Sequence, residues 1–162
     1  MAIEIERKYL VNGAGWETDQ PLRLSQAYLN RDPERTVRVR VVGEEAWLTI
    51  KGLTTGRSRA EFEYPIPIAD AEQLLKLCES PPLEKLRHIV SIGGKYWEVD
   101  QFLGENAGLV VAEIELASED EAFEKPSWLG PEVTEDRRYF NSQLVSLPYR
   151  RWPEVRDDSA LQ

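Results

Sequence analysis

The chain has 162 residues, the size of one domain or at most two small ones. Hydrophobic residues make up 41% and charged residues 30%, which is too apolar for a disordered chain. Twenty Lys and Arg residues against 29 Asp and Glu residues give a net charge of −9, which argues against nucleic acid or an anionic membrane as the main partner.

Alternation of apolar and polar residues with period two, typical of half-buried β-strands, recurs along most of the chain. It predicts eight strands, at residues 2–11, 22–30, 36–42, 45–52, 57–66, 83–92, 95–102 and 109–116. The pair Gly93-Gly94 predicts a tight hairpin between the sixth and seventh strands. Gly43 and residues 52–56 predict two further hairpin loops.

Three helices are expected beside these strands. The first begins with a capping box at Asp70 and ends at Pro81. A second, short helix is expected over 118–123, and a third over 134–147 with Thr134 as its cap. We find no repeat or linker, so we expect one domain over residues 2–147 and a polar C-terminal tail over 148–162. Eight strands with few helices predict an α+β, mainly antiparallel fold, either a barrel or a sandwich.

The chain has one cysteine, Cys78, and one histidine, His88, which limits its metal chemistry. A disulfide scaffold, a multi-Cys site and a His-pair site are excluded. Any metal ion must be held by carboxylates, which favours a hard cation such as Mg²⁺ or Mn²⁺. No apolar run approaches the roughly 18 residues of a membrane span, and the N-terminus lacks a signal-peptide pattern, so a cytoplasmic protein is expected.

Charged residues occupy one face of almost every predicted strand, because residues i, i+2 and i+4 share a face. These residues are, in chain order, Glu4, Glu6, Lys8, Arg38, Arg40, Lys51, Arg59, Glu61, Glu63, Lys85, Arg87, Glu98, Asp100, Glu113 and Glu115. A charged strand face is usually just solvated. Here, however, like charges come in blocks, and neighbouring like charges repel each other unless something opposes them.

Closing these strands into a barrel would turn the charged face into a lumen. A dry charged lumen would be unstable, whereas a water-filled tunnel with acidic and basic sectors, covered outside by amphipathic helices, would not. Such a tunnel suits a polyanion that is held by Lys and Arg and bridged by divalent cations to carboxylates. A linear triphosphate satisfies both sectors at once.

The same residues resemble a known family. Residues 4–8, E-I-E-R-K, match the N-terminal E-x-E-x-K signature of the CYTH superfamily, the triphosphate tunnel metalloenzymes. Further matches lie at residues 26–29, 37–40, 48–52, 58–64, 84–87, 98–102, 112–116 and 132–139. The resemblance spans residues 2–147 and implies an eight-stranded antiparallel tunnel that binds triphosphates with Mg²⁺ or Mn²⁺.

Short bacterial members of the family are most often linked to hydrolysis of inorganic tripolyphosphate, so this reaction, yielding pyrophosphate and phosphate, is the expected function. Three alternatives stay open: a class IV adenylate cyclase, a thiamine triphosphatase, and a non-catalytic polyphosphate or nucleotide sensor. A homodimer is a further expectation from the family. His88 stands where relatives often carry Tyr, and its parity predicts that it faces outward without a catalytic role.

The carboxylates are the candidate metal ligands. We expect one or two divalent cations to be held by Glu4, Glu6, Glu113 and Glu115, aided by Asp100. The alternative is that these carboxylates only form ion pairs with Lys and Arg of the lumen. Glu61 and Glu63 are expected either to act as second-site ligands or to orient the attacking water, with structural ion pairing as the competing interpretation.

The cations are the candidate substrate ligands. We expect the triphosphate to be clamped by Arg38, Arg40, Lys51, Lys85 and Arg87. Lys8 is expected near the reacting end, where it binds substrate and assists proton transfer, or else acts as a partner of Glu4 or Glu6. Arg59 is expected to contact phosphate or to pair with Glu61. Tyr28 is expected near the scissile phosphate, with a place in the core as the alternative.

Overall fold

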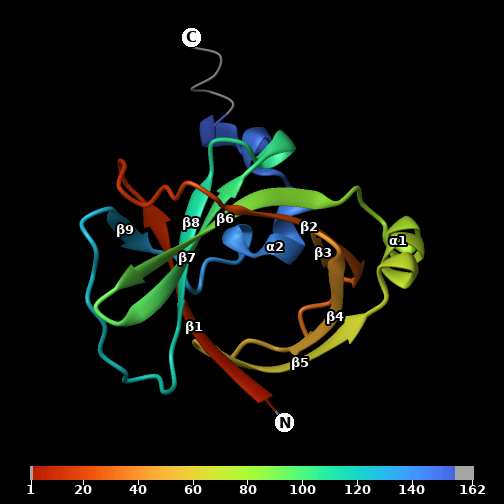
Figure 1. The fold of residues 1–162 in the computed structure, drawn as a ribbon, viewed down its shortest axis with the longest axis horizontal. Coiled ribbons are helices and arrows are strands. Elements are labelled where there is room, and N and C mark those ends of the chain that lie inside the picture. Colours follow the sequence, from red (N-terminus) through yellow and green to blue (C-terminus); the bar gives the residue numbers. More distant parts are fainter. Residues whose placement is uncertain (1, 156–162) are drawn as a thin grey trace.

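The computed structural model describes residues 2–155; Met1 and residues 156–162, which end the expected tail, lie outside the described part. The nine strands found within residues 2–155 belong to one sheet that curves into a barrel, in the order β5-β4-β3-β2-β6-β7-β8-β1-β9, with β5 also paired to β1 (Figure 1). The strands are β1 (Ala2–Val11), β2 (Leu22–Asn30), β3 (Arg35–Val42), β4 (Glu45–Gly52), β5 (Ser58–Ile66), β6 (Leu83–Ile92), β7 (Lys95–Phe102), β8 (Val110–Glu115) and β9 (Leu129–Glu132). The eight predicted strands and the mainly antiparallel barrel are therefore confirmed.

Strand β1 closes the barrel because it is long enough to take three partners. Its residues 2–5 pair with β5, and its residues 6–10 pair with β8 on the opposite edge. Tyr9 and Val11 pair in addition with β9. Strand β9 was not predicted, because its four residues, Leu-Gly-Pro-Glu, lack alternation and include a proline, which within sheets is largely confined to edge strands.

The predicted hairpin turn is present at Gly93-Gly94, which joins Ile92 of β6 directly to Lys95 of β7. Both glycines have positive φ, 58° and 80°, as a two-residue turn matched to the strand twist requires. Only glycine adopts these angles readily, so the sequence signal has a direct physical cause.

Helix α1 (Ile68–Leu77) is also confirmed, but it begins before Asp70. Its N-cap is Pro67 and makes no side-chain cap hydrogen bond, so the expected capping box at Asp70 is wrong. Asp70 instead lies in the first turn, where a carboxylate interacts favourably with the helix dipole. The helix packs on the outer face of β2, β3 and β4, where Ala71 joins a core cluster with Val39 and Ala46 (Figure 1).

The helix expected over 118–123 is absent, and only a turn forms at its start. The Glu121 carboxylate accepts a hydrogen bond from the backbone N–H of Ala117 at 2.6 Å and pairs with Lys95, so it caps the turn and is anchored to β7. With Pro126 so close, the segment is too short to propagate as a helix.

The helix expected over 134–147 is also wrong as a single element. Thr134 is buried, and its Oγ1 accepts a hydrogen bond from the backbone N–H of Lys8 at 3.0 Å, so it extends the pairing with β1 instead of capping a helix. Short helices follow it: η2 (Arg137–Tyr139), α2 (Asn141–Leu144) and η3 (Tyr149–Arg151). A further 3-10 turn, η1 (Gly104–Asn106), precedes β8.

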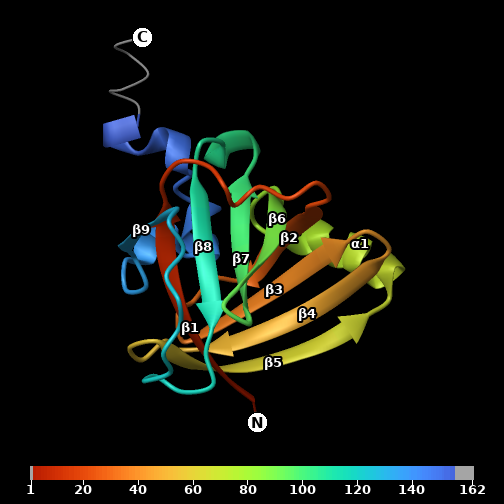
Figure 2. The ribbon, with the colours of Figure 1, turned by 60° about the vertical axis from the view of Figure 1, so that its left-hand side comes forward.

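Residues 137–155, called the closing segment below, cover one end of the barrel (Figure 2). Leu144 and Trp152 join a core cluster with Leu83 and Phe102 of the sheet. Trp152 packs edge-to-face on Tyr139 and on Tyr149, with ring centroids 5.1 and 5.2 Å apart. Residues 148–155, expected to belong to a polar tail, are thus part of the packed fold.

A third core cluster lies outside the barrel, on the outer faces of β1, β7 and β8. Trp97 is its centre, in contact with Tyr9 and covered by Trp16 and Trp128 from the connecting segments. The hydrophobic core therefore surrounds the barrel wall, which leaves the lumen free for charged groups. No helix within residues 2–155 is long and apolar enough to span a membrane.

Candidate active site

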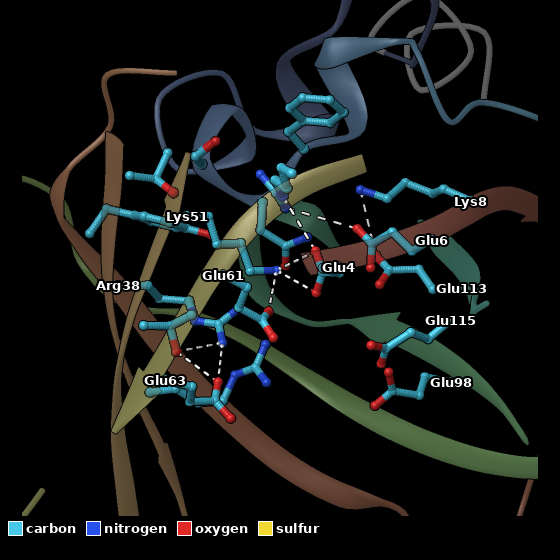
Figure 3. A pocket seen from close by; sticks show the side chains of 18 of the residues that line it. Glu4, Glu6, Lys8, Arg38, Lys51, Glu61, Glu63, Glu98, Glu113 and Glu115 are labelled. Carbon is cyan, nitrogen blue, oxygen red and sulfur yellow. Dashed lines mark hydrogen bonds and ion pairs between the residues drawn. The ribbon is translucent and has the colours of Figure 1, made fainter. Parts of the chain in front are cut away.

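The barrel lumen holds a cavity of about 200 Å³ whose wall is charged (Figure 3). Its carboxylates are Glu4, Glu6, Glu61, Glu63, Glu98, Glu113 and Glu115. Its cations are Lys8, Arg38, Arg40, Lys51, Arg59, Lys85 and Arg87, and its other lining residues are Tyr28, Thr36, Thr49, Phe140, Asn141 and Ser142. The prediction that the charged strand faces share one channel is confirmed, and of the predicted site residues only Asp100 lies behind the cavity wall.

The acidic sector is built by β1, β7 and β8, whose register places like charges opposite each other. Glu6 faces Glu115, and Glu98 faces Glu113. Directly opposed like charges destabilise a sheet. Within this crowded sector, burial first and then the charges of Glu113 and Glu4 raise the pKa of Glu6 to about 8, and burial first and then Glu4 and Glu98 raise the pKa of Glu115.

Glu4 lies on the same strand face but in the opposite electrostatic environment. Lys51 Nζ lies 2.9 Å from its Oε1 and 3.0 Å from its Oε2, and Arg59 Nε lies 3.3 Å from its Oε1. Burial alone would raise the pKa of Glu4, but these two cations hold it at about 2. Glu61, 3.3 Å from the same Lys51, has its pKa raised to about 7 by burial and by a hydrogen bond with Glu4.

In the basic sector, Arg38 and Arg40 of β3 differ in what holds them. Arg38 donates to Thr49 at 3.2 Å and lies 3.4 Å from Glu63, while its buried Nε has no hydrogen-bond partner within residues 2–155. Arg40 donates to Gln26 at 2.9 Å. Burial, with Arg38 and Arg87 nearby, lowers the pKa of Arg40 to about 9.

Asp100 was expected to be a metal ligand, but in the structure it is the buried counter-ion of two cations. Lys85 Nζ lies 2.7 Å from its Oδ2, and Arg87 donates to both of its oxygens, at 2.8 and 3.0 Å. Burial opposes ionisation, but these cations hold the pKa of Asp100 far below its usual range. Burial lowers the pKa of Lys85 to about 7 despite the attraction of Asp100.

Lys8 and Arg59 lie beside the closing segment. Lys8 Nζ is 3.5 Å from Glu113 and 4.9 Å from the ring centroid of Phe140, so its carboxylate partner is on β8 and not the expected Glu4 or Glu6. Arg59 pairs with Glu4 and, at 3.9 Å, with Glu6, in place of the expected Glu61. Tyr28 lies opposite Arg38 in the sheet, and both residues line the cavity.

Sequence reasoning missed the part of the wall that does not come from strands. Phe140, Asn141 and Ser142 reach the cavity from the closing segment, where no alternation signals which side chains point inward. Gln26 could have been predicted as a site residue from sequence, because it lies two residues before Tyr28 and therefore shares its strand face. In the structure its side chain is fully buried. His88 faces outward as expected, where it packs on Trp16.

Metal binding is consistent with the chemistry of the acidic sector, although its side chains do not converge in this arrangement. Within residues 2–155 no three Asp, Glu, His or Cys side chains form a ready metal site. The sector nevertheless offers only oxygen donors, which Mg²⁺ and Mn²⁺ prefer, and it contains two opposed carboxylate pairs that a divalent cation would neutralise. Glu6, Glu113 and Glu115 therefore fit a hard divalent cation.

Comparison with known proteins finds similarity over nearly the whole chain. The model of the CYTH domain family matches residues 2–146. An inorganic triphosphatase of Acetivibrio thermocellus is 48% identical over 156 residues, which are 95% of this chain and 100% of the relative. An inorganic triphosphatase of Nitrosomonas europaea is 37% identical over 150 residues, which are 90% of this chain and 99% of the relative.

Solved structures show the same barrel. The crystal structure of an inorganic triphosphatase, 36% identical, matches with a TM-score of 0.63 over 87% of this chain and 96% of that one. A putative adenylyl cyclase from Hippeastrum, described as having a dominant triphosphatase activity, matches with a TM-score of 0.52 over 73% of this chain and 80% of that one. At 11% identity, this second likeness concerns the fold alone.

Proposed function

Because the chain belongs to the CYTH domain family, we propose that it hydrolyses a triphosphate in a reaction that depends on a divalent metal, with inorganic tripolyphosphate as substrate and pyrophosphate and phosphate as products. The observation that carries this proposal is the lumen itself, where an acidic sector on β1, β7 and β8 faces a basic sector on β3, β4 and β6. The names of the two inorganic triphosphatases above, whose whole length the chain matches, support the substrate.

Glu6, Glu113 and Glu115 are the proposed ligands of Mg²⁺ or Mn²⁺, with Glu4 at the edge of the set. The ion would neutralise charge on the phosphate oxygens, which otherwise repels an attacking water. Asp100, already shared between Lys85 and Arg87, serves better as the counter-ion that orients both side chains and favours their ionised forms.

The cations bind and orient the substrate. Arg38 and Arg40 present guanidinium N–H groups to phosphate, and the unpartnered Nε of Arg38 supports this role. Lys51, Lys85, Arg87 and Arg59 supply further positive charge in the wall. Fixed cations in a confined lumen stabilise the charge that develops on the leaving pyrophosphate. The rate enhancement therefore comes from positioning of the substrate and from electrostatic stabilisation of the transition state.

Proton transfer is proposed for Glu61, whose pKa of about 7 makes it half ionised at neutral pH. Such a carboxyl can take a proton from the attacking water at one of its oxygens and return it to solvent. Glu63, paired with Arg38, is placed to orient that water. Lys8 and Tyr28, which line the same cavity, are proposed to contact the reacting phosphate.

The test is a phosphate-release panel with tripolyphosphate, ATP and thiamine triphosphate, each with Mg²⁺ and with Mn²⁺. Glu4→Gln and Glu115→Gln should abolish metal-dependent turnover, and Arg40→Ala should raise KM. Glu72→Gln, an exposed carboxylate on α1, is the matched control and should change nothing. Cyclic AMP from ATP would identify a cyclase, binding without phosphate release would identify a sensor, and full activity in all three lumen variants would refute the site.

A further inference from the structure

Arg40 differs from the other cations of the lumen in having no carboxylate partner. Each of the other lumen cations has at least one carboxylate within 4.0 Å, namely Lys8–Glu113, Arg38–Glu63, Lys51–Glu4 and Lys51–Glu61, Arg59–Glu4 and Arg59–Glu6, Lys85–Asp100, and Arg87–Asp100 and Arg87–Glu98. Within residues 2–155 no carboxylate lies that close to Arg40. Its Nε instead donates to the neutral Gln26 side chain, at 2.9 Å from Oε1.

Gln26 is in turn held by Asn141 of the closing segment. Gln26 Nε2 donates to Asn141 Oδ1 at 3.1 Å, and the same oxygen accepts a hydrogen bond from Lys85 Nζ at 2.8 Å. Lys and Arg side chains only donate hydrogen bonds. Lys85 and Arg40, at the two ends of this series of hydrogen bonds, therefore fix which way the side-chain amides of Asn141 and Gln26 point. The network Lys85–Asn141–Gln26–Arg40 has one consistent orientation.

A neutral partner has a specific consequence for Arg40. A carboxylate at this position would fix the guanidinium but cancel its charge, whereas an amide oxygen fixes it and leaves the charge available. With Nε occupied by Gln26, the Nη atoms remain for a phosphate group, which binds guanidinium through paired hydrogen bonds. Gln26 is fully buried, so water does not compete for this bond.

We propose that Asn141 is a positioning residue for substrate binding, which acts through Gln26 to aim the uncancelled charge of Arg40 at a phosphate group of the triphosphate. The inference rests on the proposed function and adds a residue from outside the strands to it. Because Asn141 is the first residue of α2, the segment that closes the barrel also sets the geometry of a substrate ligand on β3.

The test compares Asn141→Ala, Arg40→Ala and the double variant. Asn141→Ala should raise KM for tripolyphosphate about tenfold, with kcat within about threefold, because a hydrogen bond that orients a charged group is lost while the reacting groups stay. In the Arg40→Ala background the same substitution should raise KM clearly less than in the parent protein, since only the contact of Asn141 with Lys85 is then left to lose. Gln143→Ala, which removes an amide from the same helix away from the main cavity, is the matched control and should leave KM unchanged.

Calorimetric binding of tripolyphosphate to the metal-free proteins gives a readout independent of turnover, and its dissociation constants should follow the same pattern. Additive effects of the two substitutions, or a KM for Asn141→Ala within twofold of the parent, would overturn the inference. A parent protein that binds tripolyphosphate without cleaving it would refute only the proposed function, because the binding series still decides the role of Asn141. A parent protein that neither binds nor cleaves tripolyphosphate would overturn both.

Discussion

Replacing Glu6 by Gln should stabilise the metal-free protein while abolishing metal-dependent activity. Glu6 is a lumen carboxyl whose pKa is raised to about 8 by burial and by Glu113 and Glu4, against a free value of 4.5. Below about pH 4.5 the Glu6 carboxyl is protonated in the folded and unfolded chains alike, so it does not lower the free energy of unfolding. Between about pH 4.5 and 8 the unfolded chain releases the proton that the folded protein retains, so stability falls as pH rises.

The size of the effect follows from the two pKa values. At pH 7 a carboxyl that titrates at about 8 when folded and at 4.5 when unfolded lowers the free energy of unfolding by about 3 kcal/mol. Gln is uncharged at every pH and removes this term. For a chain of this length, about 3 kcal/mol corresponds to a rise of roughly 6 to 12 °C in the unfolding midpoint.

The assay is thermal unfolding in EDTA at pH 5 and at pH 8. The rise in the unfolding midpoint caused by Glu6→Gln should be small at pH 5 and large at pH 8. Glu4→Gln is the matched control on the same strand face, and it should lower the midpoint at both values, because Lys51 and Arg59 stabilise ionised Glu4 and hold its pKa at about 2. In excess Mg²⁺ the parent should gain stability that Glu6→Gln does not. A midpoint for Glu6→Gln at or below that of the parent at pH 8 would refute the electrostatic reasoning.

Three further predictions concern the site and its support. Asp100→Asn should cost about 3–5 kcal/mol in urea unfolding, because it leaves the buried Lys85 without its counter-ion and Arg87 with Glu98 alone; a cost under 1 kcal/mol would contradict that role. Chelation with EDTA should stop phosphate release from tripolyphosphate, and Mg²⁺ or Mn²⁺ should restore it; activity that persists in EDTA would exclude metal dependence. Trp97→Ala should cost about 3–5 kcal/mol in urea unfolding with KM unchanged, because Trp97 is buried outside the lumen; a changed KM would show that this core cluster shapes the site.

The strands and the side of the wall that each strand residue faces were predictable from sequence. Alternation with period two is a local property, and Glu4, Glu6 and Lys8 must share a face in any extended strand. The blocks of like charge on that face already indicated a lumen, since exposed strands have no reason to carry them. Hairpin signals such as Gly93-Gly94 were predictable for the same reason, because the turn geometry depends on two neighbouring residues.

The closing segment was not predictable, because no period governs it. Apolar residues at helical spacing over 134–147 favoured one helix, yet the backbone of Lys8 binds Thr134, and Tyr139 and Trp152 pack together at the end of the barrel. Contacts between residues this distant in sequence override weak helix propensity in a short segment. Phe140 and Asn141 entered the site only as a result of that packing.

The sequence by itself determined that acidic and basic residues would line one wet channel, because strand geometry assigns each side chain to a face. Only the tertiary structure decided which partners meet, because ion pairs depend on register and barrel closure across the whole chain. Closure gave Glu4 two cations and left Glu6 buried beside Glu113 and Glu4, so two carboxylates of one strand face have pKa values of about 2 and about 8. The register between neighbouring strands placed Asp100 opposite Arg87 and the neutral Gln26 opposite Arg40, and alternation along a single strand does not contain these distinctions.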